Sequence, residues 1–469
     1  MSLTDLTLAQ AAAGVAAGEF TAMELTAAAL ARIEAVNPTL NAFVRVEEET
    51  AREGAAAVDA KRAAGQPLGP LAGVPLAHKD MYYREGGLTT CGSKIRREFR
   101  PEVTSTALGR LAEAGATYLG GLNMAEFAMG PTGHNEHFGP CRNPWDPERI
   151  TGGSSSGSGS ATGGRLCYGA LGSDTGGSIR LPAGFCNLAG MKPTQTRVSR
   201  FGVMGLSFSL DNVGPLTRTV LDNALMLAAI AGHDPLDPTS APVPVPDYAA
   251  AARAPKAAGV RVGVARGFFE EDADELALAA RDSALGSLVS AGARLVEVDV
   301  GDMARINALS APLTASEAAT LHAHWLRERR EDYGAQMRAR CEMGFRFSAV
   351  DYLSAVQLRP RIVTAFVERV FSACDVLLAP TFNVATPTIE ETDVGSSQGF
   401  EEVISRLSRC TRPFNYLTLP GLALPTPEAV LGMPGSIQLL ARPFGEAALY
   451  RLGAAYEAET GFSSRSPDL

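Results

Sequence analysis

Apolar residues in the first part of the chain recur at the spacing of helices. In TAMELTAAALARIEAVNP, apolar positions repeat every three to four residues, Thr21 is a suitable N-cap, and Pro38 is expected to follow the end of the helix. A second, alanine-rich helix is predicted over 48–64, and a third over 104–116 in TSTALGRLAEAGA.

Short apolar runs separate and follow these helices. PLAGVPLAHKDMY at 70–82 and ATYLGGLNM at 116–124 have the length and composition of buried strands. GVRVGVARG at 259–267 predicts another strand, and DVLLAPT at 375–381 predicts a strand that returns to the same sheet. Helices that alternate with such runs favour a mixed α/β fold.

Two further segments differ from this alternating pattern. Residues 234–247, DPLDPTSAPVPVPD, carry five prolines and predict an exposed connection. Residues 270–360 are rich in charge and are predicted to be mostly helical.

Composition narrows the class of protein. The chain has 469 residues, of which 46% are hydrophobic and 20% charged, as in globular proteins with a large core. A net charge of −9 gives no basic surface that would attract nucleic acid, so a nucleic-acid partner is not expected. Seven cysteines without a CxxC pair predict neither a disulfide framework nor a zinc site. No signal peptide and no membrane span is recognised, so a cytoplasmic protein is expected.

The stretch TGGSSSGSGSATGG at 151–164 has the composition of a flexible linker. The residues that follow it argue against a linker, because RLCYGALGSDTGGSIRLPAGFCNLAG is apolar and rich in glycine. Only three charged residues occur from 151 to 190. This segment is therefore expected to be buried, where its glycines let chains approach closely or let backbone N–H groups converge on a ligand.

The ligand of such a loop is more plausibly an oxyanion than a phosphate. The phosphate-binding pattern GxxxxGK[ST] is absent, and GSDTGGSIR lacks the GxGxxG spacing of dinucleotide-binding folds. In SDTGGS, the N–H groups of Thr175, Gly176, Gly177 and Ser178 can point into one small volume and stabilise a tetrahedral acyl intermediate. Ser178, which closes this loop, is a candidate nucleophile.

A serine nucleophile needs a base, and the histidines are poor candidates. None of the six lies in a recognisable triad motif, and the two in LHAH would face apart on a helix. Cys186 as an alternative nucleophile is equally well explained as a small buried residue. Lys79 ends an apolar run in GVPLAHKD. It either reaches solvent or an acidic partner, or it is buried among hydroxyl groups, where desolvation lowers its pKa and makes it a neutral base.

Three motifs carry a family resemblance. GVPLAHKD, TGGSSSGSGS and GSDTGGSIRLPAGFCNLAGMKPT, in that order, resemble the amidase signature family of Ser-cis-Ser-Lys hydrolases. The resemblance implies a mixed central β-sheet covered by helices on both faces. It also implies a single large domain over 1–469, with a core at about 60–230 and 375–460 and a helical substrate-pocket segment at about 265–360.

The resemblance also implies roles for individual residues. Ser178 is the acyl nucleophile, Ser154 is the bridging serine after a cis peptide bond, and Lys79 is the ultimate base. Thr175, Gly176 and Gly177, with Ser178, supply the oxyanion N–H groups. The sequence departs from the family at Ser156, which replaces a common glycine, and at Met81, where asparagine is common.

The substrate is less clearly indicated. One branch of the family is the glutaminase subunit of a tRNA-dependent amidotransferase, which EFAMGPTGHNEHFGPCRNPWD at 126–146 resembles. That branch binds the amino group of glutamine through an aspartate seven positions before an asparagine; counting back from Asn415 gives Ser408. We therefore expect a free-standing amidase that acts on a small aryl or alkyl amide, or on a carbamate or urea-type C–N bond. Two alternatives remain, the glutaminase of that amidotransferase and a non-catalytic binding module on the same fold.

The expected pocket and partners follow from this preference. The 127–132 loop, including Met129, and parts of 310–350 are expected to line the pocket. Trp325, Phe345 and Phe347 there suggest a hydrophobic substrate group, although core packing explains them equally well. We expect a small-molecule amide substrate, no metal, no cofactor and no membrane, and leave a homodimer open.

Overall fold

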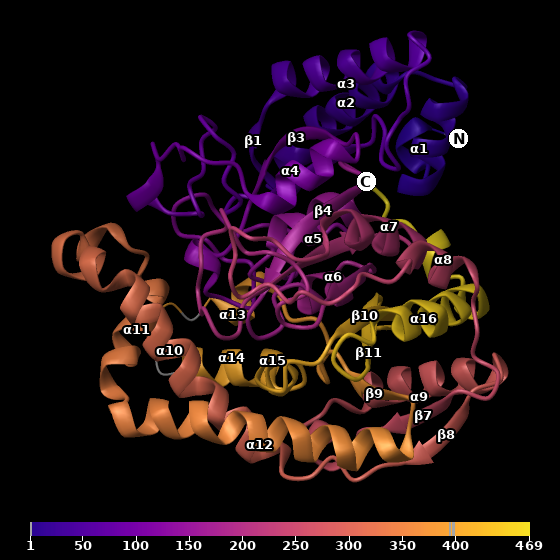
Figure 1. Cartoon of the computed structure of the whole chain (residues 1–469). Coiled ribbons are helices and arrows are strands. Elements are labelled where there is room, and N and C mark those ends of the chain that lie inside the picture. The colour runs from indigo at the N-terminus through magenta and orange to yellow at the C-terminus, as the bar shows by residue number, and fades with distance from the viewer. Residues whose placement is uncertain (1, 394, 396–398) are drawn as a thin grey trace.

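The computed structural model describes residues 2–393, 395 and 399–469 (Figure 1). One sheet of eleven strands has the order β1-β3-β2-β4-β6-β5-β10-β11-β9-β7-β8. Four pairs, β2–β3, β2–β4, β7–β8 and β7–β9, are parallel and the rest antiparallel, which confirms the predicted mixed sheet. The strands are β1 Phe43–Val46, β2 Pro75–Lys79, β3 Thr117–Leu122, β4 Gly169–Asp174, β5 Ala189–Lys192, β6 Asn212–Thr217, β7 Arg261–Val264, β8 Arg294–Glu297, β9 Val376–Pro380, β10 Gly421–Val430 and β11 Met433–Leu440.

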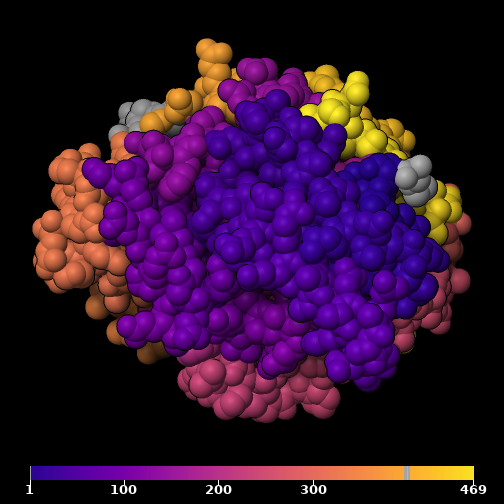
Figure 2. Space-filling view, turned by 90° about the horizontal axis from the view of Figure 1, so that it is seen from above, coloured from indigo at the N-terminus to yellow at the C-terminus, as the bar shows by residue number. Residues whose placement is uncertain are grey.

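Helices surround this sheet, and the C-terminal residue lies against one of them, since the Arg32 guanidinium donates to the Leu469 carbonyl at 3.1 Å. In the face shown in Figure 2, the N-terminal part of the chain forms most of the surface. The helices are α1 Leu8–Ala17, α2 Ala22–Leu40, α3 Glu48–Ala63, α4 Thr106–Glu113, α5 Ser156–Gly163, α6 Arg180–Phe185, α7 Val220–Ile230, α8 Tyr248–Arg253, α9 Glu275–Ser290, α10 Met303–Glu328, α11 Ala335–Met343, α12 Ala349–Ala373, α13 Ile389–Thr392, α14 Gly399–Ser408, α15 Arg412–Tyr416 and α16 Glu446–Thr460.

Neighbouring residues of the central strands β2 and β4 enter different cores, because side chains alternate between the two faces of a sheet. Leu76 and Leu171 pack in the largest core, with residues of α7, α9 and α16. Ala77 and Ala170 pack on the opposite face, with residues of α2 and α5. Burial on both faces explains why the strands read as continuous apolar runs rather than as alternating ones.

The glycine- and serine-rich stretch is buried, as predicted, but it also contains a helix that the sequence did not indicate. Every residue of α5 is buried. A Cβ on Gly157 would lie 2.4 Å from the Ala42 carbonyl oxygen, so the helix approaches its neighbours closely. The hydroxyls of Ser158 and Ser160 donate to the carbonyls of Leu171 and Arg142 at 3.0 and 2.7 Å. Close packing and satisfied hydroxyls thus override the weak helix propensity of glycine and serine.

One local prediction needs correction, and another is confirmed. α2 continues through Pro38 to Leu40 and ends where Asn41 adopts a left-handed conformation, because a proline in the last turn removes only one helical hydrogen bond. The 234–247 segment is mostly exposed, as predicted. Its Asp234 and Asp237 are buried and accept hydrogen bonds that hold successive turns.

Within the part of the chain that the structure describes, no helix is long and apolar enough to cross a membrane.

We predict that Gly157→Ala destabilises the protein by about 1–3 kcal/mol, because the added methyl group meets the backbone of Ala42 and Asn123. Gly286→Ala is the matched control, since Gly286 is exposed in the middle of α9 with open space around it. The control should gain up to about 1 kcal/mol from helix propensity. Urea unfolding of both variants checks this, and equal stabilities would contradict the close packing of α5.

Candidate active site

Lys79 lies at the carboxyl end of β2 with 1% of its surface exposed. Its Nζ lies 2.7 Å from Ser154 Oγ and 2.8 Å from Ser173 Oγ. Burial lowers the pKa of this amine from 10.5 to about 7, although the charges of Asp211 and Asp174 partly oppose the shift. A lysine in this state is neutral for much of the time near neutral pH and can accept a proton.

Ser154 is held in a loop that precedes α5. It is fully buried, and the Gly153–Ser154 peptide bond is cis, as the family resemblance implies. The loop is tied to the 125–131 segment by two backbone hydrogen bonds. Gly153 N donates to the Pro131 carbonyl at 2.7 Å, and Ala125 N donates to the Ser154 carbonyl at 3.1 Å.

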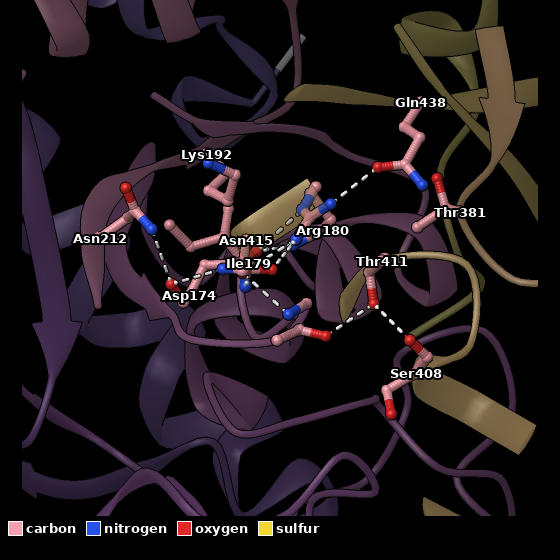
Figure 3. A network of polar contacts seen from close by, with 12 residues as sticks. Asp174, Ile179, Arg180, Lys192, Asn212, Thr381, Ser408, Thr411, Asn415 and Gln438 are labelled. Atoms are coloured by element: carbon pink, nitrogen blue, oxygen red, sulfur yellow. Dashed lines mark hydrogen bonds and ion pairs between the residues drawn. The ribbon is translucent and has the colours of Figure 1, made fainter. Parts of the chain in front are cut away.

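A buried carboxylate, Asp174, organises the loop that follows β4 (Figure 3). It accepts from the amides of Gly177 at 2.8 Å and Ile179 at 3.2 Å, and from the Arg180 guanidinium at 3.0 Å. Asn415 Nδ2 also donates to it at 2.8 Å. Burial alone would raise the pKa of Asp174, but the charge and hydrogen bonds of Arg180 hold it well below its ordinary range.

Side-chain hydroxyls fasten the rest of this loop. Thr175 Oγ1 donates to Asp211 at 2.5 Å. Thr411, whose contacts are drawn in Figure 3, donates through Oγ1 to the Gly176 carbonyl at 2.7 Å. The Gly177 amide, which the family resemblance assigned to the oxyanion donors, donates to Asp174 at 2.8 Å in this structure. A φ of 132° at Gly177 produces this turn, and a side chain there would collide with Thr411.

A surface cavity lies in front of the loop, and Ser178, Thr175, Gly176 and Met129 line it together. The helical segment contributes Thr314 and Arg340, and the C-terminal part contributes Ile404, Ser408 and Arg412. Phe347 lines an adjoining cavity with Met129, whereas Phe345 is mostly exposed and Trp325 stacks on Phe127 at 5.4 Å. Of the three aromatic candidates, only Phe347 is therefore placed near the substrate region.

Sequence reasoning missed several residues that hold the site. Ser173 contacts the Lys79 amine, and Asp211 holds Thr175 while accepting from the Leu206 and Ser207 amides. Ser173 directly precedes Asp174 in the GSDTGG motif, which was the available signal. Asp211 lies outside the motifs, and Thr411, although it lies between the motif positions Ser408 and Asn415, is far from the glycine loop in sequence; only the fold brings both to that loop.

The site combines a buried amine that can be neutral, a serine hydroxyl in contact with it, and a glycine loop that carries a partly exposed serine. These are the groups that a serine hydrolase with a lysine base requires. A family model described as Amidase matches residues 24–450, and the chain belongs to this family. It is an amide-hydrolysing enzyme.

Similar proteins are known by both sequence and structure. A glutamyl-tRNA(Gln) amidotransferase subunit from Myxococcus xanthus is 40% identical over the whole of both chains. The protein of the same name from Moorella thermoacetica is also 40% identical, over 96% of each chain. A solved structure described as a vestigial protein complex that reveals the origins of an s-triazine catabolic enzyme has a TM-score of 0.89 at 35% identity. The match covers 97% of this chain and 98% of that one.

These relatives overturn two expectations. The prediction of a free-standing amidase for aryl or alkyl amides is wrong, because full-length relatives at this identity are named as subunits of a glutamyl-tRNA(Gln) amidotransferase. The expectation of no nucleic-acid partner is wrong for the same reason, since that name includes a tRNA. A net negative charge summed over the whole chain was therefore not a sufficient reason to exclude such a partner.

We predict that Lys79→Met changes stability in a pH-dependent way. The pKa of the Lys79 amine is about 7 in the folded chain, against the ordinary value of 10.5 that applies when the chain is unfolded. Between pH 7 and pH 10.5 the unfolded state therefore binds more protons than the folded state. Stability therefore rises with pH across this window, and burial of the charged amine costs most below pH 7. Lys192, whose pKa burial also lowers to about 7, is present in both proteins and cancels in the comparison.

The stability of Lys79→Met relative to the parent should accordingly be greatest at pH 7 and decline toward pH 10. Denaturant unfolding at both pH values checks this, and an equal difference at the two would show that Lys79 does not titrate abnormally.

Proposed function

We propose that this chain is the amide-hydrolysing subunit of an amidotransferase, and that it releases ammonia from glutamine for use on glutamyl-tRNA(Gln). The observation that carries the proposal is 40% identity, over the full length of both chains, to a relative of that name. The proposal includes partner subunits, a single domain spanning 1–469, and a cytoplasmic location, where charged tRNA is used.

In the proposed reaction, Ser178 attacks the amide carbon and forms an acyl-enzyme. The neutral amine of Lys79 takes the proton of Ser154 while Ser154 takes that of Ser178. The 2.7 Å contact between Lys79 and Ser154 supports the first of these transfers. The same relay in reverse protonates the leaving nitrogen, and general acid help of this kind is typically worth about 10²–10⁴-fold. Water then hydrolyses the acyl-enzyme.

Backbone amides of Thr175, Gly176 and Ser178 are the proposed donors to the oxyanion. These three residues line the cavity, and the hydrogen bonds of Thr175 and Gly176 to Asp211 and Thr411 support a rigid arrangement. One such donor is typically worth roughly 3 kcal/mol of transition-state stabilisation. No reorganisation is needed when charge develops, because the loop is already fastened.

Recognition of the remote end of glutamine is proposed to involve the arginine-rich side of the cavity. Arg340 and Arg412 line it, and their positive charge suits an α-carboxylate. Ser408 lies on the same side, where it accepts from Arg412 at 2.7 Å. Among the described lining residues there is no carboxylate to pair with an α-ammonium group.

We predict that a fluorophosphonate probe labels Ser178, that Ser178→Ala abolishes labelling, and that Lys79→Ala slows it by about 10²–10⁴-fold. Labelling by the parent should rise as pH passes about 7, because Lys79 must lose its proton to act as the base. Mass spectrometry of the labelled peptide checks the site. A labelling rate that is flat from pH 5 to pH 9 would contradict the role of Lys79.

We predict that ammonia is released from glutamine when the chain is assembled with its partner subunits and glutamyl-tRNA(Gln), and that Ser178→Ala removes this activity. Glutaramate, which lacks the α-ammonium group, should be hydrolysed comparably. Ser408→Asp supplies a counter-charge for the α-ammonium group. It should raise the ratio of glutamine to glutaramate hydrolysis by about 5- to 10-fold, a typical effect of one added ion pair in a cavity. Absence of glutamine hydrolysis by the assembled enzyme would refute the proposed function.

A further inference from the structure

A neutral lysine amine can serve as a base only if its lone pair faces the hydroxyl that gives up the proton. The amine has one lone pair and two N–H bonds, so its N–H groups need acceptors elsewhere. Two hydroxyl oxygens lie within hydrogen-bond distance of Lys79 Nζ, Ser154 at 2.7 Å and Ser173 at 2.8 Å. If Ser154 is to donate to the lone pair, Ser173 must accept an N–H.

Ser173 is well placed to be that acceptor. It lies in β4, is 4% exposed, and its backbone is fixed on both sides by Ser155. The Ser173 amide donates to Ser155 Oγ at 3.2 Å, and Ser155 Oγ donates to the Ser173 carbonyl at 3.2 Å. The side chain of Ser173 is thus held against the amine by a rigid strand end.

The hydrogen of the Ser173 hydroxyl has its own acceptor. Ser173 Oγ lies 3.2 Å from the thioether sulfur of Met81, to which it donates, and Met81 is 2% exposed. A thioether accepts hydrogen bonds but cannot donate them. The hydroxyl is therefore directed away from Lys79, and its oxygen is left to accept from the amine.

We propose that Ser173 and Met81 are positioning residues that orient the Lys79 amine, through a chain of hydrogen bonds running from N–H to hydroxyl to sulfur, so that its lone pair faces Ser154. This inference rests on the proposed function of Lys79 as the base. Without Met81, the Ser173 hydroxyl can turn and donate to the lone pair, in competition with Ser154. Without Ser173, the amine has no acceptor that fixes its rotation.

The charges around the amine are unaffected by these two residues. The charged and titratable groups that act on Lys79 are the carboxylates of Asp211 and Asp174 and the thiol of Cys91. Ser173 and Met81 are uncharged. Their replacement therefore changes the direction and hydrogen bonding of the amine, and leaves the field of neighbouring charges in place.

The test is the rate at which a fluorophosphonate labels Ser178, measured from pH 5 to pH 10. Ser173→Ala should lower the rate on the alkaline plateau by about 10- to 100-fold, the effect of losing one buried hydrogen bond. It should also move the midpoint to lower pH, because the protonated amine loses more from a missing acceptor than the neutral one. Ser173→Thr keeps the hydroxyl and should restore most of both properties.

Met81→Leu tests the sulfur, because leucine keeps the bulk and removes the acceptor. It should lower the plateau several-fold in the parent and leave the Ser173→Ala variant unchanged, since Met81 acts only through Ser173. Ser158→Ala is the matched control. Ser158 is buried against the same strand, where it donates to the Leu171 carbonyl, but the Lys79 amine is not among its partners. This control should lose stability without a change in the plateau rate or the midpoint.

Each outcome separates the inference from the proposed function. A parent protein that is not labelled would refute the proposed catalytic centre and the inference with it. A labelled parent with a Ser173→Ala plateau within twofold of normal would overturn the inference alone. Additive losses from Ser173→Ala and Met81→Leu would likewise overturn it, because they would show that the sulfur acts independently of the hydroxyl. Thermal unfolding of Ser173→Thr and Met81→Leu establishes that the rates compare folded proteins.

Discussion

The removal of the Lys79 amine from water is the constraint on which the rest of the site depends. An amine at the end of a buried strand is costly to keep charged, and that cost lowers its pKa so that its neutral form is available as a base near neutral pH. Hydroxyl groups rather than carboxylates lie in direct contact with it. A carboxylate in direct contact would raise the pKa of the amine and keep it protonated near neutral pH, where it could not accept a proton, so the kind of group in contact matters as much as the burial.

The glycine loop is organised by a group that stays charged, in contrast to the Lys79 amine. The Asp174 carboxylate is compensated by Arg180, Asn415 and several backbone amides, which all donate to it. A buried pair of this kind contributes little net stability in general, but removing one partner is costly. Its value here is geometric, because the carboxylate decides which amides of the loop face the cavity and which do not.

The sequence predicted those contacts of the site whose residues lie in recognisable motifs, and it did not predict contacts that depend on backbone conformation or on residues distant in the chain. The contact of Lys79 with Ser154 could be anticipated because both lie in recognisable motifs. The direction of the Gly177 amide could not be anticipated, because it depends on the positive φ of Gly177 and on the side chain of Asp174. The helix at 156–163 was missed because its packing partners, Ala42 and Asn123, are distant in sequence. The substrate class could not be predicted from Ser408, because the lack of a counter-ion at one position carries less information than a similarity that extends over the whole chain.

The hydrogen bonds of Asp174 and Arg180 also join residues that are synthesised early to residues that are synthesised late. Asn415 lies 241 positions beyond Asp174 in the chain, and Gln438, which accepts from Arg180, lies 258 positions beyond that arginine. A nascent chain that still lacks these residues carries the complete Lys79 and Ser154 motifs and the contacts of Asp174 with Gly177, Ile179 and Arg180, but not those made through Asn415 and Gln438. The glycine loop therefore has its full set of partners only when nearly the whole chain is present, and a fragment that ends before Asn415 lacks two of them.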